Sequence, residues 1–294
     1  MNKSLRGQLH QQCSLAEYTS WRVGGPAKQV YKPADVADLS LFLQMLPANE
    51  PIIWLGLGSN TLIRDKGFAG TVIITQGLLK QIATIQPNLL RAEAGVACAS
   101  LARTAVRQGL LGIEFLAGIP GTIGGALRMN AGCFNGETWQ FVTEVEVMNR
   151  NGEILKRSPD DFAIAYRQVD AKYSDEWFIA GYFRLQSGDK QKGLDQIRHL
   201  LDRRAATQPT GDYSCGSVFR NPPGDHAARL IESCGLKGYR IGDAVVSEKH
   251  ANFIVNIGHA TANDIEQLIA TVATRVAEQC GVELQTEMHV FGEK

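Results

Sequence analysis

The sequence AGIPGTIGGALRMNAG, residues 117–132, decides how the fold of this chain is read. Glycines and other small residues are dense here, although each glycine inside a helix or strand costs about 0.5–1 kcal/mol relative to alanine. We therefore expect a loop rather than a regular helix or strand, with backbone N–H groups that approach a ligand closely, most often a phosphate. A compact turn between two core elements is the alternative, because isolated glycine motifs are weak signals.

A second glycine loop, LGLGSN at 55–60, directly follows a predicted buried strand at Ile52–Leu55. It is not a Rossmann fingerprint, because it lacks the third glycine, a following amphipathic helix and the acidic residue that closes a βαβ unit. Two such loops suit a dinucleotide lying extended between them. A dinucleotide site without the Rossmann pattern indicates flavin.

The composition is that of a globular chain of two or three domains, with 294 residues, 44% hydrophobic and 20% charged. Thirty basic residues balance thirty acidic ones, so no net field attracts nucleic acid or an anionic membrane, and we expect neither as a partner. There is no signal-peptide pattern and no apolar run of ~20 residues, which predicts a cytoplasmic protein. Six scattered cysteines without C-x-x-C spacing predict free thiols and no metal site.

Periodicity and turn signals predict an α+β protein without internal repeats. Gly109 is placed to end one helix, and Asn151-Gly152 is a strong hairpin signal because both residues tolerate positive φ. Asn263 with Glu266 resembles a capping box, and Gly281 is placed to end that helix. The expected helices are 36–46, 100–108, 190–206 and 264–280, and the expected strands are 52–55, 71–75, 145–149, 153–155, 177–185 and 252–257.

Seven motifs occur in an order that identifies a family. They are TSWRVGGPA (19–27), GLGSN (56–60), GIPGTIGGA (118–126), AYR (165–167), CGSVFRNP (215–222), VSEKHANF (246–253) and the terminal Glu287. With these, the chain resembles the UDP-N-acetylenolpyruvoylglucosamine reductase family from about residue 19 to residue 287. So many ordered matches are far more specific than any one motif.

The resemblance implies an α+β fold in which a two-part FAD-binding unit of the vanillyl-alcohol-oxidase (PCMH) type precedes an α+β substrate-binding domain. The FAD-binding parts are expected at 1–75 and 76–186 and the substrate-binding domain at 187–282, with the tail 283–294 returning near the active site. The short segment between Arg167 and Ser217 resembles the branch of the family without a long tyrosine-bearing loop. The glycine loop at 56–62 contains no histidine, so we expect non-covalent FAD.

The resemblance also implies the chemistry: NADPH reduces FAD, and a hydride then passes to the enolpyruvyl methylene carbon of a UDP-sugar in peptidoglycan precursor synthesis. The resulting enolate needs fixed donors and a proton. Arg167 matches the group beside the enolate, and Ser217 matches the proton donor. Glu287 matches a second electrostatic group, which we expect to be protonated or to orient Arg167 or a water.

The remaining site residues follow from the same matches. The cofactor-binding residues are expected to be Gly56, Leu57, Gly58, Ser59, Asn60, Thr61, Gly118, Pro120, Gly121, Thr122, Gly124, Gly125, Ala126, Asn130, Ala131, Gly132 and Ile179. The substrate-binding residues are expected to be Tyr166, Arg220, Asn221, Lys249 and His250, of which Arg220 and Lys249 are also candidate cations beside Ser217.

Two alternatives remain at this stage. One is a flavin oxidase of the same fold that acts on a small alcohol. The other is a nucleotide-sugar-binding protein without chemistry, whose glycine loops hold only phosphate. For the reductase we expect a monomer.

Overall fold

The computed structural model describes residues 4–294, which separate into two units. Unit 1 comprises residues 4–11, 29–57 and 70–203, and unit 2 comprises residues 12–28, 58–69 and 204–294. The chain passes between the units after residues 11, 28, 57, 69 and 203. The break after residue 57 lies within the glycine loop, and the break after residue 203 lies near the end of helix α4 (Lys190–Thr207). The three-part division expected from the sequence stays a prediction.

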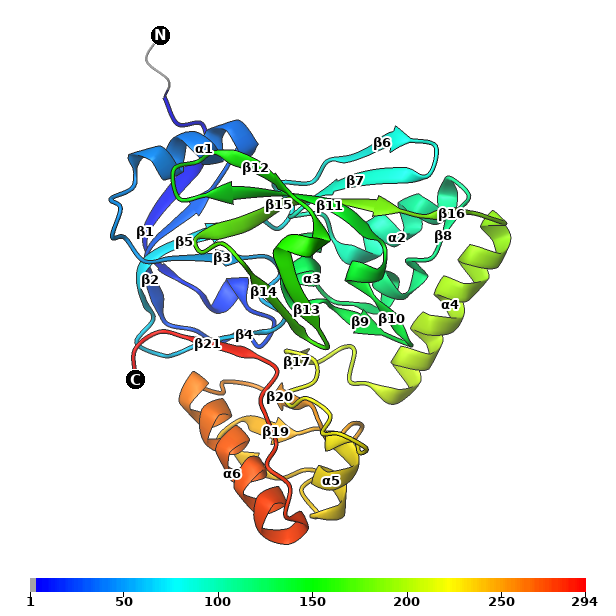
Figure 1. Ribbon diagram of the computed structural model, residues 1–294. Coiled ribbons are helices and arrows are strands. Elements are labelled where there is room, and N and C mark those ends of the chain that lie inside the picture. Colours follow the sequence, from blue (N-terminus) through cyan, green and yellow to red (C-terminus); the bar gives the residue numbers. More distant parts are fainter. Residues whose placement is uncertain (1–3) are drawn as a thin grey trace. The chain divides into compact units, whose positions relative to one another are not determined.

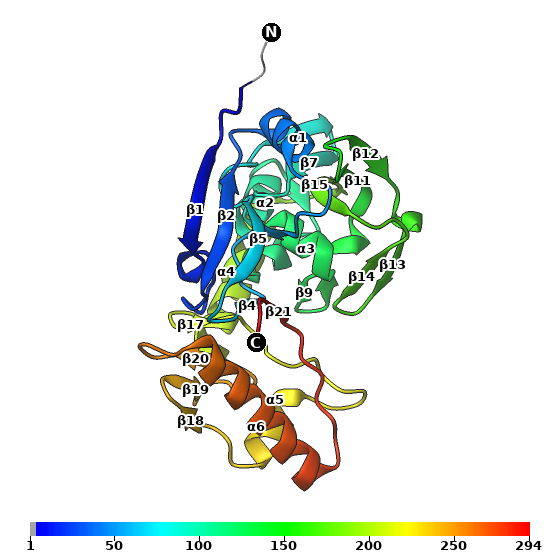
Figure 2. The same ribbon diagram turned by 90° about the vertical axis from the view of Figure 1, so that its left-hand side faces the viewer.

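The first sheet has the strand order β1-β2-β5-β3, in which β3 and β5 run parallel. Figure 2 shows β1, β2 and β5 side by side. Helix α1 (Val36–Met45) begins at Asp35, whose carboxylate accepts the N–H of Asp38. The apolar face of α1 is buried with Tyr31 and Ile73, as the helical period predicts. The strands are β1 (Gln8–Ser14), β2 (Pro26–Lys32), β3 (Ile52–Leu55) and β5 (Phe68–Ile74).

The second sheet of unit 1 is antiparallel, with the order β12-β11-β15-β7-β6 (Figure 1). Its strands are β6 (Ile82–Gln86), β7 (Leu89–Glu93), β11 (Val142–Asn149), β12 (Ile154–Arg157) and β15 (Glu176–Arg184). The Asn151-Gly152 turn joins β11 to β12, and Gly152 has φ +76°, which confirms the predicted hairpin. Helices α2 (Cys98–Arg107) and α3 (Ile123–Met129) share the core of this sheet.

Short elements complete unit 1. They are β8 (Leu110–Leu111), η2 (Glu114–Gly118), β9 (Gly132–Cys133), β10 (Gly136–Glu137), η3 (Thr138–Gln140), η4 (Pro159–Asp161), β13 (Phe162–Ala165), β14 (Gln168–Ala171) and β16 (Gln186–Ser187).

Unit 2 is built on the sheet β17-β20-β19-β18, with helices α5 and α6 packed around a common core. Trp21, from the TSWRVGGPA motif, is fully buried in that core and donates its indole N–H to the Ile254 carbonyl at 2.8 Å. The elements are η1 (Ala16–Tyr18), β4 (Thr61–Ile63), β17 (Tyr213–Ser214), α5 (Ala227–Ser233), β18 (Arg240–Ile241), β19 (Ala244–Val246), β20 (Ile254–Asn256), α6 (Ala262–Cys280) and β21 (His289–Phe291).

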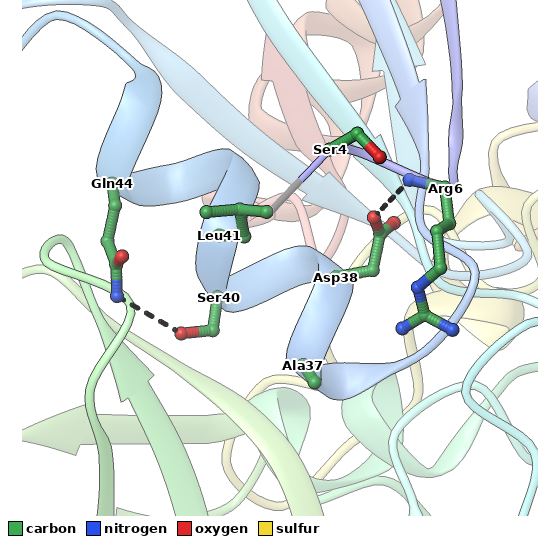
Figure 3. A pocket seen from close by; sticks show the side chains of 7 residues that line it. All are labelled: Ser4, Arg6, Ala37, Asp38, Ser40, Leu41 and Gln44. Carbon is green, nitrogen blue, oxygen red and sulfur yellow. Dashed lines mark hydrogen bonds between the residues drawn. The ribbon is translucent and has the colours of Figure 1, made fainter. Parts of the chain in front are cut away.

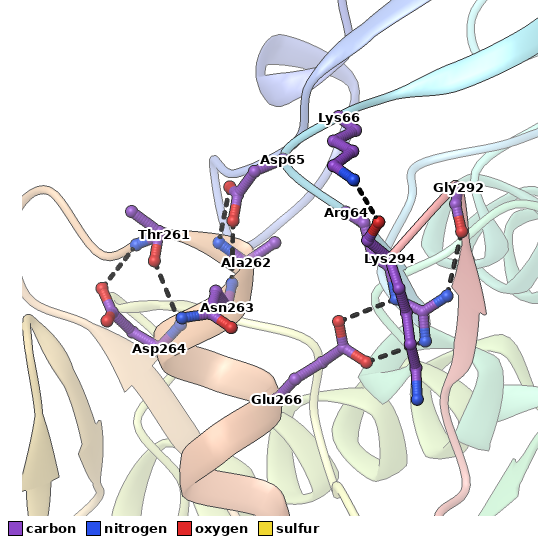
Figure 4. A network of polar contacts seen from close by, with 10 residues as sticks. All are labelled: Arg64, Asp65, Lys66, Thr261, Ala262, Asn263, Asp264, Glu266, Gly292 and Lys294. Atoms are coloured by element: carbon purple, nitrogen blue, oxygen red, sulfur yellow. Dashed lines mark hydrogen bonds and ion pairs between the residues drawn. The ribbon is translucent and has the colours of Figure 1, made fainter.

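Helix α6 begins two residues earlier than a cap at Asn263 predicts. Thr261 is the N-cap and forms a capping box with Asp264. The carboxylate of Asp65 accepts the N–H groups of Ala262 and Asn263 at 2.9 and 3.0 Å (Figure 4). The predicted box was wrong because Thr261 caps the helix instead, its hydroxyl accepting the Asp264 N–H at 3.0 Å, so Asn263 lies inside the first turn. The end of α6 at Gly281, with φ +67°, is confirmed.

The glycine stretch is not a loop throughout, because α3 runs through Gly124 and Gly125. Within 117–132 only Asn130 has positive φ, at +42°. The glycines of this stretch are therefore not required by a left-handed backbone conformation. At Gly124 a Cβ would lie 3.0 Å from the Cβ of Ala94, and at Gly132 a Cβ would lie 2.3 Å from the Gly136 carbonyl oxygen, so both allow close packing of the chain on itself.

A surface pocket of about 290 Å³ lies against α1 and includes none of the predicted site residues (Figure 3). Its lining residues are Ser4, Arg6, Ala37, Asp38, Ser40, Leu41 and Gln44. The backbone N–H of Arg6 donates to the Asp38 carboxylate at 2.7 Å. Two of the lining residues therefore join the N-terminal segment to α1.

Among residues 4–294, no helix combines the length and apolarity needed to cross a membrane. Within the same range, no three His, Cys, Asp or Glu side chains cluster in a way that would hold a metal ion. The cysteines are free thiols, as predicted, and Cys234 and Cys280 bring their sulfur atoms within 3.6 Å of each other.

Candidate functional site

Backbone pairing fixes the glycine stretch of unit 1 against the segment that follows β7. Ile123 and Gly124 donate their N–H groups to Val96 and Ala94, each at 2.8 Å. Cys98 donates in return to the Gly121 carbonyl at 3.0 Å. The start of α3 is therefore held rigidly, and neighbouring groups are presented at fixed positions.

Thr122 lies where the two glycine loops meet. Its hydroxyl oxygen is 2.3 Å from the position that a Cβ on Gly56 would occupy, so only glycine fits there. The hydroxyl is buried and forms no hydrogen bond within the described chain. A buried hydroxyl without a partner costs about 1–3 kcal/mol, so the fold carries a donor that a ligand can use.

Gly125 has a different environment from Gly124. It is exposed on α3, and a Cβ added to it would meet only the Thr122 hydroxyl, at 3.9 Å. Alanine is preferred over glycine in a helix, so the chain itself gives no reason for glycine here. An open backbone beside an unpaired hydroxyl fits a group with several acceptor atoms, which FAD possesses.

The side chain of Asn130, which was expected to contact the cofactor, forms hydrogen bonds to three other residues of unit 1. Its amide N–H₂ group donates to Glu137 at 2.9 Å and to the Ala165 carbonyl at 3.2 Å. Its amide oxygen accepts the N–H of Trp139 at 3.1 Å. Asn130 thus braces the turn that carries Arg167. Ile179 likewise lies fully buried in the core beside β5 and α1, and its carbonyl accepts the Ala94 N–H.

Tyr166 and Arg167 form the two-residue turn between β13 and β14. Arg167 has φ +57°, a conformation that non-glycine residues rarely adopt and that often marks a functional constraint. Tyr166 is 49% exposed, and the Arg167 guanidinium lies 5.6 Å from the centre of its ring. The turn therefore presents an aromatic face and a cation together.

In unit 2 the residues after Ser217 pair with the C-terminal tail. Glu287 donates its N–H to the Val218 carbonyl at 2.8 Å, and Arg220 donates to the Gln285 carbonyl at 2.9 Å. Ser217 and Glu287 thus lie on neighbouring antiparallel segments, joined by the Phe219–Thr286 bridge. These two predicted catalytic residues are far apart in the sequence and are brought together by the fold.

Cys215, two residues before Ser217, is a buried thiol. Burial raises its pKa well above the ordinary value of 9.0, and the nearby Glu287 carboxylate raises it further. Cys215 stays protonated at neutral pH and is a poor nucleophile.

Asn60 joins the glycine loop to the tail within unit 2. Its side-chain amide donates to the Glu287 carbonyl at 3.1 Å, and its own carbonyl accepts the His289 N–H at 3.0 Å. Strand β21 then continues parallel to β4. The tail returns to this loop through backbone pairing that no local sequence signal predicts.

The predicted substrate-binding residues of unit 2 have structural contacts of their own. The amide oxygen of Asn221 accepts the N–H of Ala227 at the start of α5, at 3.1 Å. The Lys249 ammonium donates to the Ala205 carbonyl in the last turn of α4, where the helix dipole favours a cation. Neither contact tests a role toward substrate.

His250 is held in its neutral form. Burial lowers its pKa below 6.5, and the charge of Lys237 lowers it further. Its Nδ1 atom is buried and forms no hydrogen bond within the described chain, and its ring packs edge-on against Phe253. His250 can therefore offer a neutral hydrogen-bonding group, but not a charge, at neutral pH.

Asn252, for which the sequence alone indicated no role, contacts the segment that follows Ser217. Asn252 is 4% exposed, and its amide bonds to both the N–H and the carbonyl of Phe219. A polar side chain inside the apolar run at 251–255 was the available signal, because buried amides are retained where they satisfy specific partners.

Two family models match the chain. The model described as "UDP-N-acetylenolpyruvoylglucosamine reductase, C-terminal domain" matches residues 208–291, and the model described as "FAD binding domain" matches residues 27–158.

The curated relatives carry the same description. A UDP-N-acetylenolpyruvoylglucosamine reductase of Legionella pneumophila (strain Corby) is 62% identical, over 95% of this chain and 91% of the relative. One from Coxiella burnetii (strain Dugway 5J108-111) is 55% identical, over 98% of this chain and 97% of the relative. The crystal structure of the Thermus caldophilus reductase matches with a TM-score of 0.82 and 33% identity, over 98% of this chain and 100% of that one.

Proposed function

This chain belongs to the UDP-N-acetylenolpyruvoylglucosamine reductase family, and we infer that it reduces UDP-N-acetylenolpyruvoylglucosamine to UDP-N-acetylmuramate in peptidoglycan synthesis. FAD is its cofactor and NADPH its reductant. The observation that carries this conclusion is identity of 55–62% to reductases of this name over nearly the whole chain.

We propose that the two glycine loops, at 56–60 and 117–132, would hold FAD non-covalently. The Thr122 hydroxyl is the donor that the fold leaves unpaired, and the exposed backbone of Gly125 lets the group approach closely. When bound there, FAD would supply the hydride chemistry that links oxidation of NADPH to reduction of the substrate. We propose residues 1–75 and 76–186 as the FAD-binding part and 187–282 as the substrate-binding part.

The protein must stabilise and protonate the substrate after the hydride arrives at the methylene carbon. The electron pair of the double bond then lies on the adjacent carbon and its carboxylate, as an enolate. Arg167 pairs with that carboxylate, since guanidinium and carboxylate match in a two-pronged geometry. Ser217 donates the proton to the carbon, and the two steps together consume one hydride and one proton.

The backbone of Glu287 pairs with Val218, the residue after the proton donor. We propose that the Glu287 side chain is protonated or orients Arg167 or a water, because an ionised carboxylate would repel the enolate. The nucleotide sugar is bound by five residues, which are Tyr166, Arg220, Asn221, Lys249 and His250. In its neutral form His250 adds a hydrogen bond without adding charge. We further propose a cytoplasmic monomer of the branch without the long tyrosine-bearing loop.

The test is to purify the protein, record a flavin spectrum, and measure NADPH oxidation with and without the enolpyruvyl substrate. NADPH consumption should depend on that substrate. Consumption indifferent to it would refute the reductase assignment, and oxygen uptake without NADPH use would support a flavin oxidase. Absence of bound flavin would support a binding protein without chemistry.

The proton-donor role has its own test. Ser217→Ala should keep flavin reduction by NADPH but lose most turnover of the enolpyruvyl substrate. Equal loss in both half-reactions would show that Ser217 does not donate the proton.

A further inference from the structure

The segment that carries Ser217 continues into a short stretch of backbone, Val218–Phe219, whose polar groups are all bonded. Glu287 bonds to the Val218 carbonyl on one side. Asn252 accounts for the other three groups: its carbonyl accepts the Val218 N–H at 2.9 Å, and its side-chain amide accepts the Phe219 N–H at 2.9 Å and donates to the Phe219 carbonyl at 2.8 Å. The side chain thereby pairs with Phe219 as a neighbouring strand would.

Asn252 is itself fixed. The turn that carries it is closed by hydrogen bonds from Phe253 to the His250 carbonyl and from Ser247 to the Phe253 carbonyl. The side chain is 4% exposed, so water does not compete for its bonds. Val218 and Phe219 are buried to a similar degree, so their backbone groups have no solvent alternative.

We propose that Asn252 is a positioning residue for the reduction of the enolpyruvyl substrate: it holds the Ser217 segment in register against the Glu287 segment. This inference rests on the proposed function, since it assigns Asn252 a purpose through Ser217. The physical reason is that proton transfer requires donor and carbon at a defined distance. A shift of about 1 Å in such a group can cost about 100-fold in rate.

The chain offers a matched control in Asn256. It is 5% exposed, and its amide donates to the Trp21 carbonyl at 2.9 Å and accepts the N–H groups of Gly258 and Ala260 at 3.0 and 3.1 Å. It therefore resembles Asn252 in burial and bonding, but none of these three side-chain hydrogen bonds goes to residues 217–219. Asn→Asp at either position replaces the donating N–H₂ group with an oxygen that faces a carbonyl.

The experiment compares Asn252→Asp, Asn252→Ser and Asn256→Asp as flavin-bound enzymes. Each is reduced with NADPH and then mixed with the enolpyruvyl substrate, and the return of oxidised flavin is followed. We expect both Asn252 variants to be about 10- to 100-fold slower in this second step, with flavin reduction by NADPH within about twofold of wild type. Asn256→Asp should lower the thermal midpoint and keep wild-type rates in both steps.

Two further measurements separate positioning from general loosening. In a Ser217→Ala background the substitution at Asn252 should have no further effect on the second step, because a residue that acts through Ser217 cannot act without it. Hydrogen exchange of the peptide around 217–220 should be faster in the Asn252 variants and unchanged in Asn256→Asp.

The outcomes are distinguishable. If wild-type reduced enzyme is not reoxidised by the enolpyruvyl substrate, the proposed function fails. If it is, and Ser217→Ala is slow while the Asn252 variants are as fast as wild type, only the positioning role is overturned. Equal slowing by Asn256→Asp, additivity with Ser217→Ala, or failure of both Asn252 variants to yield flavin-bound enzyme also overturns it.

Discussion

Two adjacent glycines of α3 should respond in opposite ways to alanine. Gly125 is exposed, has no positive φ, and meets nothing within 3.4 Å of an added Cβ. Gly125→Ala should therefore stabilise the flavin-free protein by about 0.5–1 kcal/mol, the ordinary preference of a helix for alanine. Gly124→Ala forces a methyl group to within 3.0 Å of Ala94, so it should destabilise the protein by about 1–3 kcal/mol.

FAD affinity should change the other way at Gly125. If the cofactor contacts this backbone, the added methyl overpacks the contact by about 1–3 kcal/mol, which raises the dissociation constant roughly 5- to 150-fold. Thermal midpoints of the flavin-free proteins and flavin titrations followed by fluorescence measure the two effects. A Gly125→Ala protein that is more stable and binds FAD with wild-type affinity would refute the placement of the cofactor beside Gly125.

Substitutions at three other positions probe separate contacts. Thr122→Val removes the unpaired buried hydroxyl, so the flavin-free protein should be no less stable while FAD binds about 10-fold more weakly; unchanged affinity in the titration would contradict this. Asp65→Ala removes the acceptor of two N–H groups at the start of α6 and should cost about 1–2 kcal/mol in urea unfolding, with Asp65→Asn losing less. The Arg91 guanidinium lowers the pKa of Glu146 below its ordinary value of 4.5, so this pair contributes stability that is complete above pH 4.5 and is lost as pH falls through the lowered pKa. The urea midpoint of the wild type should fall between a pH above 4.5 and one below it, and this fall should be smaller in Glu146→Gln. An equal fall in the variant would show that acid destabilises the protein through other groups.

Local signals predicted the elements whose residues satisfy one another within a few positions. Helix α2 ends where Gly109 adopts φ +72°, and the hairpin β11–β12 turns at Asn151-Gly152. The apolar face of α1 is buried as its period requires. Periodicity and turn chemistry act over one or two turns of chain, so the sequence carries them completely.

The glycine stretch shows where that reasoning stops. Its density predicted a ligand loop, yet Gly124 and Gly132 allow packing of the chain on itself, whereas a Cβ on Gly125 would meet only the Thr122 hydroxyl at 3.9 Å. A glycine is the same letter in the sequence whether a ligand or another segment of the chain occupies the space beside it.

The sequence by itself determined the family, through the order of its motifs, and with it the residues expected to react. Only the tertiary structure decided what holds them: Asn130 braces the Arg167 turn, Asn60 bonds the Glu287 backbone, and Asn252 pairs with Phe219 beside Ser217. An asparagine amide can donate and accept in many directions, so its partners depend on which distant backbone the fold brings to it. That choice is made by packing across the whole unit, and no window of sequence contains it.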